Sequence, residues 1–118
     1  MRNKREIGSE HEKLAVEFLK DNGYIIHKQN FRSGSGEIDI IGENEGYICF
    51  IEVKYRASLK DGYPEEAVDF RKIKKISRTA LAYLNYSKLG EAVPCRFDVV
   101  SILADDIKLI KNAFEMNI

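Results

Sequence analysis

Three charged residues, Asp39, Glu52 and Lys54, stand inside or at the end of apolar runs that suit the interior of a sheet. Asp39 lies within the run 38–41, and the other two lie toward the end of the run that begins at residue 47. Buried charges are costly unless they are paired or hold a metal ion. Two neighbouring carboxylates repel each other, and a divalent cation removes that conflict. Because hard oxygen atoms suit Mg²⁺ or Mn²⁺, Asp39 and Glu52 are candidate ligands of such an ion.

Lys54 follows Glu52 by two residues, so both side chains point to the same face of a strand. An ammonium group in that position could orient or deprotonate an attacking water and offset the charge that develops on a phosphate. The alternative interpretation is a plain salt bridge between Glu52 and Lys54, with Asp39 at a solvated strand end. From the residues alone, a catalytic site and a structural ion pair both stay open.

The position of Asp39 relative to Glu52 depends on the turn of the hairpin that joins the two runs. A two-residue loop at 45–46 places Asp39 opposite Glu52. A two-residue loop at 44–45 places Asp39 opposite Phe50 and diagonal to Glu52, whereas a three-residue loop turns Asp39 to the other face. Both short turns therefore bring the two carboxylates together.

The remaining pattern predicts an α/β fold in which a mixed sheet is flanked by helices. Ser9 and Glu12 form a capping-box pattern at the start of a first helix, which ends at residues 22–23. Asp69 is a candidate N-cap of a second helix. A strand, a crossover helix and a further strand imply a parallel strand pair. In chain order we expect a helix from residue 9, a strand at 24–31, a loop at 32–36, the hairpin up to residue 54, a polar loop at 56–66, a helix after residue 69, a strand at 95–103 and an edge strand at 107–114.

The 118 residues suit a single domain, and their 19 basic and 19 acidic side chains give a net charge of zero. Overall basicity therefore does not point to a nucleic-acid partner, but residues 71–78 contain five basic residues and no acid. The N-terminal residues lack the apolar core of a signal peptide, and no run approaches the length of a transmembrane helix. We expect a cytoplasmic protein that does not associate with membranes.

The chemistry-bearing residues belong to longer motifs that are spread over nearly the whole chain. Their order, an aspartate, a hairpin turn and then Glu-x-Lys, is similar to the PD-(D/E)xK nuclease superfamily, which has a restriction-endonuclease-like fold with an αβββαβ core. More narrowly, the chain resembles the small bacterial YraN-like family. The motifs that carry this resemblance are Gly36-Glu37-Ile38-Asp39, Phe50-Ile51-Glu52-Val53-Lys54-x-Arg56, Glu65-x-Ala67-Val68 followed by Lys72, Arg96-Phe97-Asp98-Val99-Val100, and Asn112-Ala113-Phe114.

The resemblance implies a single restriction-endonuclease-like domain, residues 1–118, with an extra C-terminal edge strand. It implies an endonuclease that hydrolyses phosphodiester bonds in DNA with Mg²⁺ or Mn²⁺ as its cofactor. Asp39 and Glu52 would be metal ligands, and the carbonyl group of Val53 would be a backbone ligand. Lys54 would be the catalytic lysine.

Two further charged positions have competing interpretations. Glu12 resembles the first-helix glutamate that archaeal Holliday-junction resolvases place beside the metal. Its alternative role is the capping box with Ser9, and one side chain cannot serve both at once. Arg96 and Asp98 share one face of a strand, and we expect them to form a buried ion pair or a helix cap rather than a catalytic pair.

Basic side chains near the candidate site are the predicted DNA contacts. Arg56 lies just beyond Lys54 on the same face, and the second helix turns a basic face outward. Because the net charge is zero, we expect a structured substrate such as branched or nicked DNA rather than a long duplex. A homodimeric assembly stays open, and so do two alternative functions: a non-catalytic nucleic-acid-binding module, and a structural or partner-binding protein. The residues predicted to contact DNA are Arg56, Lys72, Lys75 and Arg78.

Overall fold

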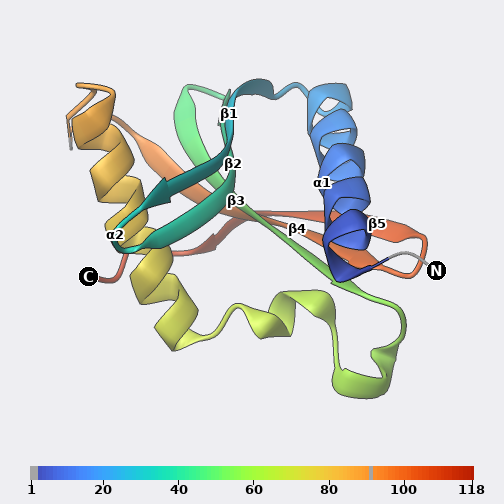
Figure 1. The fold of residues 1–118 in the computed structure, drawn as a ribbon. Coiled ribbons are helices and arrows are strands. Elements are labelled where there is room, and N and C mark those ends of the chain that lie inside the picture. The colour runs from blue at the N-terminus through green and yellow to red at the C-terminus, as the bar shows by residue number, and fades with distance from the viewer. Residues whose placement is uncertain (1–2, 91) are drawn as a thin grey trace.

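The computed structural model describes residues 3–90 and 92–118, and it confirms the predicted α/β architecture (Figure 1). The elements follow the predicted order of a helix, three strands, a second helix, a fourth strand and an edge strand. Two short 3₁₀ helices, η1 and η2, lie between the third strand and the second helix, where a polar loop was expected. In chain order the elements are α1 (Lys4–Asp21), β1 (Ile25–Ser33), β2 (Gly36–Asn44), β3 (Tyr47–Arg56), η1 (Leu59–Asp61), η2 (Pro64–Ala67), α2 (Phe70–Tyr86), β4 (Cys95–Leu103) and β5 (Asp106–Phe114).

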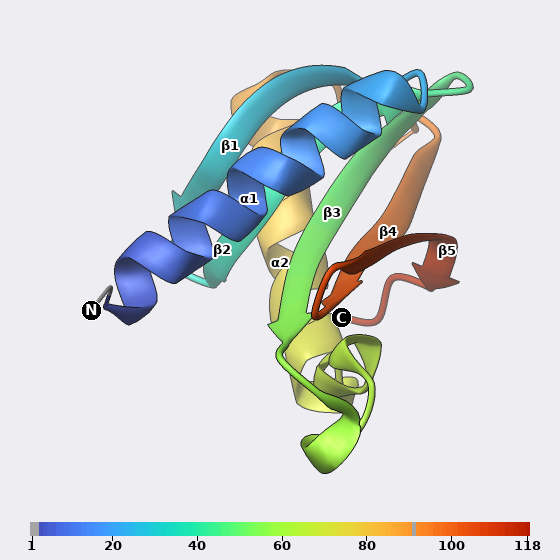
Figure 2. The ribbon, with the colours of Figure 1, turned by 90° about the vertical axis from the view of Figure 1, so that its right-hand side faces the viewer.

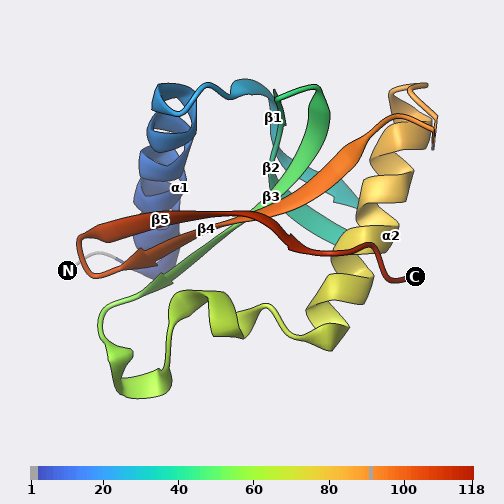
Figure 3. The same cartoon turned by 180° about the vertical axis from the view of Figure 1, so that it is seen from behind.

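The five strands form one mixed sheet in the order β1-β2-β3-β4-β5. β3 and β4 are parallel, as the crossover through α2 requires, and the other neighbouring strands are antiparallel. α1 packs against one face of the sheet and α2 against the other (Figure 1, Figure 2). The view from behind in Figure 3 shows β5 along the outer side of β4, where the sequence predicted an edge strand.

Each helix closes its own apolar core against the sheet, and alternation along β3 assigns its residues to the two cores. Ile51 belongs to the core beneath α1, whereas Phe50 belongs to the core beneath α2. Glu52 follows Ile51 and therefore faces α2. The α1 core contains Ala15, Val16, Leu19, Tyr24, Ile40, Cys49, Ile51, Val100 and Ile102, and the α2 core contains Phe31, Ile38, Ile41, Phe50, Ile76, Ala80, Leu84 and Phe97.

The first helix begins earlier than the sequence pattern predicted. Asn3 is its N-cap, and Oδ1 of Asn3 accepts a hydrogen bond of 2.9 Å from the backbone N–H of Glu6. Ser9 therefore lies inside α1, and the predicted capping box of Ser9 with Glu12 is wrong. Asparagine caps a helix as well as serine does, and a Ser-x-x-Glu spacing also occurs within helices.

Of the helices in the described part of the chain, none is long and apolar enough to cross a membrane.

The hairpin between β2 and β3 has the first of the predicted registers. Asn44 pairs with Tyr47, so residues 45–46 form the two-residue loop. Both loop residues have positive φ, 55° and 83°, as a type I′ turn requires. The last pair of this ladder joins Ile40 to Ile51, and one further step along both strands brings Asp39 opposite Glu52.

The predicted ion pair of Arg96 and Asp98 is present and buried, with Nε of Arg96 2.9 Å from Oδ1 of Asp98. The hydroxyl group of Tyr24 donates to Asp98 at 2.7 Å, and Arg96 donates to Oδ1 of Asn44 at 2.7 Å. Asp98 also accepts the backbone N–H of Asn112 at 2.9 Å. These hydrogen bonds supply the several partners that a buried ion pair needs. They also join the hairpin turn and β5 to β4, so the network has a structural role.

Candidate active site

The candidate site lies where β2 and β3 diverge (Figure 1). Beyond the pair of Ile40 and Ile51, Oδ2 of Asp39 accepts the backbone N–H of Val53 at 2.8 Å. A carboxylate thus replaces the carbonyl group that would continue an ordinary ladder. This hydrogen bond holds the Asp39 side chain against β3 at Val53, the residue that follows Glu52 in the chain.

Glu52 is almost fully buried, with 2% of its surface exposed, and its two oxygen atoms have different surroundings. Oε2 lies 3.8 Å from Nζ of Lys54 and 3.6 Å from Nζ of Lys72. Oε1 is buried and has no hydrogen-bond partner within residues 3–90 and 92–118. The salt bridge with Lys54 that was the alternative interpretation of this motif is therefore present, but it leaves one carboxylate oxygen unpartnered.

The two carboxylates raise the free energy of each other's charged form. Burial and, to a smaller extent, the charge of Asp39 raise the pKa of Glu52 to about 7, although Lys72 and Lys54 oppose the rise. Burial also raises the pKa of Asp39, against the lowering effect of its hydrogen bond from Val53 and of the two lysines. Such a pair is stabilised by any positive charge that enters between its members.

Glu12 reaches this site from α1. Burial raises the pKa of its carboxyl group, and the charges of Asp39 and Glu37 raise that pKa further. With its amide nitrogen turned toward both carboxylates, Asn30 donates 2.9 Å hydrogen bonds to Oε1 of Glu12 and to Oε1 of Glu37. The charges of Glu12 and Asp39 therefore interact, and Glu12 has no capping role because Asn3 is the N-cap of α1.

Sequence reasoning missed Glu37 and Asn30 as members of this cluster. Glu37 stands two residues before Asp39 in a strand, and this spacing was available as a signal. Asn30 has a φ of 54°, a left-handed conformation that asparagine tolerates better than most residues, and no sequence pattern indicated it.

The predicted DNA contacts fall into two groups. Lys75 and Arg78 are exposed on α2, as expected for an outward basic face. Lys72 was predicted to lie on that outward face, but its ammonium group points to Glu52, because it stands in the first turn of α2 at the flank between the outer and inner faces. Arg56 is half-buried, and its Nε has no hydrogen-bond partner in the part of the chain that the structure describes.

The donor set of the site suits a hard divalent cation. Asp39, Glu52 and Glu12 offer only carboxylate oxygens, and Oε1 of Glu52 is buried with no hydrogen-bond partner among the described residues. Within those same residues, no group of three or more His, Cys, Asp and Glu side chains has an arrangement that could hold a metal by itself. Mg²⁺ commonly takes one or two protein carboxylates and completes its shell with waters and substrate oxygens, so the residues present fit such an ion.

The chain belongs to the Uncharacterised protein family UPF0102, whose model matches residues 11–102. This membership confirms the family that the sequence motifs indicated. The chain is similar to the UPF0102 protein of Lachnoclostridium phytofermentans, with 46% identity over 113 residues that cover 96% of each chain. The UPF0102 protein of Persephonella marina is 47% identical over 111 residues, which cover 93% of this chain and 94% of the relative. The UPF0102 protein of Acetivibrio thermocellus is 48% identical over an alignment 122 residues long, which covers 95% of this chain and 93% of the relative.

Proposed function

We propose that this member of UPF0102 is a divalent-metal-dependent endonuclease that hydrolyses phosphodiester bonds in DNA. The observation that carries this function is the buried, unpartnered Oε1 of Glu52 beside the carboxylate of Asp39, with the ammonium group of Lys54 3.8 Å from Glu52. Among the residues that the structure describes, this oxygen lacks any hydrogen bond. The resemblance of this arrangement to PD-(D/E)xK nucleases supports the same function.

In this function Asp39 and Glu52 would hold Mg²⁺ or Mn²⁺, and the carbonyl group of Val53 would be a backbone ligand. A bound ion of this kind would polarise the scissile phosphate and lower the pKa of a water molecule. The hydrogen bond from Val53 fixes Asp39 in place, so the site is preorganised before the ion arrives. Glu12 would accept hydrogen bonds from waters bound to that ion.

Lys54 would supply a hydrogen-bond donor and a positive charge at the reacting phosphate. Its ammonium group donates a hydrogen bond to the attacking water or to a phosphate oxygen, and it offsets the negative charge that grows there. Arg56 lies two residues further along β3 and would contact a neighbouring phosphate, because its guanidinium group can donate two parallel hydrogen bonds. The exposed Lys75 and Arg78 would follow the DNA backbone.

Cleavage assays with a broad panel of DNA substrates test this function. The panel includes linear, nicked and branched duplexes, and we expect Mg²⁺-dependent cleavage of at least one structured substrate. Lys54→Ala should lower the cleavage rate by roughly 10²–10⁴-fold, because Lys54 acts mainly in the transition state. Binding of the same DNA in Ca²⁺, which suppresses cleavage, should change little. Lys20→Ala, at an exposed lysine near the end of α1, is the matched control and should cut like the wild type.

The main rival function is a nucleic-acid-binding module that keeps the fold without catalysis. The pairing of Glu52 with both Lys54 and Lys72 favours this rival, because two ammonium groups can balance the two carboxylates without a metal. In that case the wild type leaves the whole panel of substrates uncut in Mg²⁺, and Lys54→Ala only weakens binding. A structural or partner-binding protein would neither cut nor bind DNA.

A further inference from the structure

Two aromatic rings are exposed between the end of β3 and the first turn of α2: Tyr63 is the N-cap of η2, and Phe70 is the first residue of α2. Tyr63 and Phe70 are 47% and 62% exposed. An ammonium group lies over each ring, that of Lys108 at 5.6 Å from the centre of Tyr63 and that of Lys74 at 5.2 Å from the centre of Phe70. Exposed rings interleaved with cations are typical of surfaces that bind single-stranded nucleic acid.

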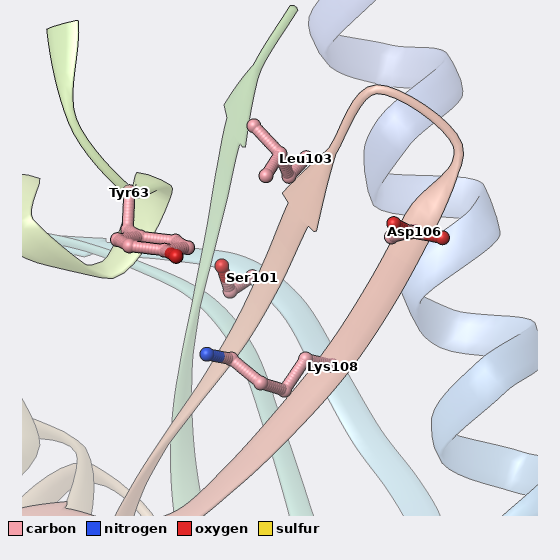
Figure 4. A pocket seen from close by; sticks show the side chains of 5 residues that line it. All are labelled: Tyr63, Ser101, Leu103, Asp106 and Lys108. Carbon is pink, nitrogen blue, oxygen red and sulfur yellow. The ribbon is translucent and has the colours of Figure 1, made fainter. Parts of the chain in front are cut away.

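Tyr63 forms one wall of a small cavity of about 170 Å³. In Figure 4 the side chains of Tyr63 and Lys108 extend from opposite sides toward Ser101 on β4. The interior is mostly apolar, with the hydroxyl, carboxylate and ammonium groups confined to a few side chains. The residues that line the cavity are Tyr63, Ser101, Leu103, Asp106 and Lys108.

Glu65 fixes the walls of this cavity in place. Its Oε1 accepts a 2.6 Å hydrogen bond from the hydroxyl group of Ser101, and its Oε2 accepts one of 2.7 Å from Nζ of Lys108. These bonds hold the pKa of Glu65 at about 2, so the carboxylate stays charged near neutral pH. The backbone N–H of Tyr63 donates to Glu66 at 3.2 Å. The cavity is therefore formed before any ligand binds.

The cavity also lies one strand away from the candidate site. In the parallel ladder of β3 and β4, Lys54 is the partner of Ser101 and Arg56 is the partner of Leu103. Partners in such a ladder point to the same face of the sheet, and neighbouring strands lie about 4.8 Å apart. A base attached beside a phosphate at Lys54 is therefore within reach of Tyr63.

We propose that the cavity at Tyr63 binds an unpaired nucleobase next to the scissile phosphate. The position of that phosphate rests on the proposed endonuclease function. The Tyr63 ring supplies a stacking face and Leu103 an apolar floor, while Lys108 and Asp106 offer a donor and an acceptor to the edge of the base. A base inside a continuous duplex is stacked on both faces and must be unstacked before it can enter the cavity, whereas a gap, flap or branch offers an unpaired base without that cost. The substrate class is therefore DNA with unpaired nucleotides.

Binding measurements on the full-length protein in Ca²⁺ test this inference. The probe is a duplex with a single-stranded gap that carries the fluorescent base 2-aminopurine, compared with a continuous duplex of the same length. We expect the wild type to quench the probe and to bind the gapped duplex more tightly. Tyr63→Ala should lose the quenching and bind the gapped duplex roughly tenfold or more weakly, whereas Tyr63→Phe should keep both. Binding of the continuous duplex should not change.

Tyr86 offers a matched control, because it is 68% exposed and has the ammonium group of Lys28 5.5 Å from its ring centre. It lies at the far end of α2, so Tyr86→Ala should behave like the wild type. The inference is overturned if Tyr63→Ala binds the gapped probe as the wild type does, if Tyr86→Ala loses as much, or if the wild type binds neither probe. Mg²⁺-dependent cleavage is scored separately. Tyr63-dependent binding without cleavage overturns the endonuclease function alone, and cleavage with no effect of Tyr63→Ala overturns the base-binding cavity alone.

Discussion

Nζ of Lys72 lies 3.6 Å from Oε2 of Glu52, the same oxygen that Lys54 approaches to 3.8 Å. Lys72 comes from the first turn of α2 and Glu52 from β3, so this contact joins the crossover helix to the candidate site. Without a divalent cation, the two ammonium groups balance part of the charge of the two buried carboxylates. A cation that binds Asp39 and Glu52 must therefore compete with Lys72.

Replacing Lys72 should strengthen metal binding. We expect Lys72→Met to bind Mn²⁺ roughly two- to fivefold more tightly than the wild type, because the competing ammonium group is gone. Isothermal titration calorimetry measures the change. Lys75→Met removes an exposed lysine from the same helix and should leave the Mn²⁺ affinity unchanged. Weaker Mn²⁺ binding by Lys72→Met would show that Lys72 supports the ion rather than competes with it.

The raised pKa of Glu52 predicts how stability depends on pH in metal-free buffer. Its folded pKa of about 7 lies above the ordinary value of 4.5, so the folded protein holds this proton more tightly than the unfolded chain. The stability that this proton contributes is fully present below pH 4.5 and is lost as the pH rises through 7. Glu52→Gln should therefore be more stable than the wild type at pH 8, by roughly 1–3 kcal/mol.

Urea unfolding of both proteins between pH 4.5 and 8 tests this dependence. The stability difference between Glu52→Gln and the wild type should shrink as the pH falls from 8 and should be smallest near pH 4.5. A difference that stays constant across the range would mean that Glu52 does not take up a proton in the folded state.

The start of α1 yields a stability prediction that separates two N-caps. Asn3→Ala removes the hydrogen bond to the N–H of Glu6 and should cost about 1 kcal/mol of unfolding free energy. Ser9→Ala should be neutral or slightly stabilising, because Ser9 lies inside the helix, where alanine is the better helix former. Thermal unfolding of the two variants compares them directly. The reverse order of effects would restore Ser9 as the cap.

Glu12→Gln tests whether the first helix contributes to the site. The substitution removes a carboxylate whose charge interacts with Asp39 but keeps an oxygen that can accept from Asn30. We expect unchanged or slightly higher thermal stability, together with weaker Mn²⁺ binding and slower cleavage. Glu17→Gln, at an exposed glutamate later in the same helix, is the control. If Glu12→Gln matches the wild type in every metal and cleavage assay, Glu12 has no part in the site.

Local signals explain which parts of the fold could be predicted from the sequence. Asp69 caps α2 through a 2.9 Å hydrogen bond from the N–H of Lys72, as its position before the apolar stripe indicated. The strand at 95–103 matches β4, because its apolar run ends at clear boundaries on both sides. The sequence left three options for the loop of the hairpin, and the pairing of Asn44 with Tyr47 in the folded chain selects the loop at 45–46.

The errors arose where a residue's role depends on distant neighbours. Ser9 and Glu12 have the spacing of a capping box, but α1 already begins at its N-cap Asn3, and a short pattern cannot distinguish these two possible starts. The direction of Lys72 depends on how α2 crosses β3, which is a tertiary property. The cluster of Glu12, Glu37 and Asn30 joins a helix to two strands, so no single stretch of the sequence contains it.

Calorimetric titration of Mn²⁺ into the metal-free protein tests the central claim most directly. We expect the wild type to bind Mn²⁺, and we expect Asp39→Asn and Glu52→Gln each to lose that binding while they stay folded. Glu45→Gln, at an exposed glutamate in the hairpin turn, should bind like the wild type. A wild-type protein that does not bind Mn²⁺, or unchanged affinity in both carboxylate variants, would contradict the assignment of Asp39 and Glu52 as a metal site.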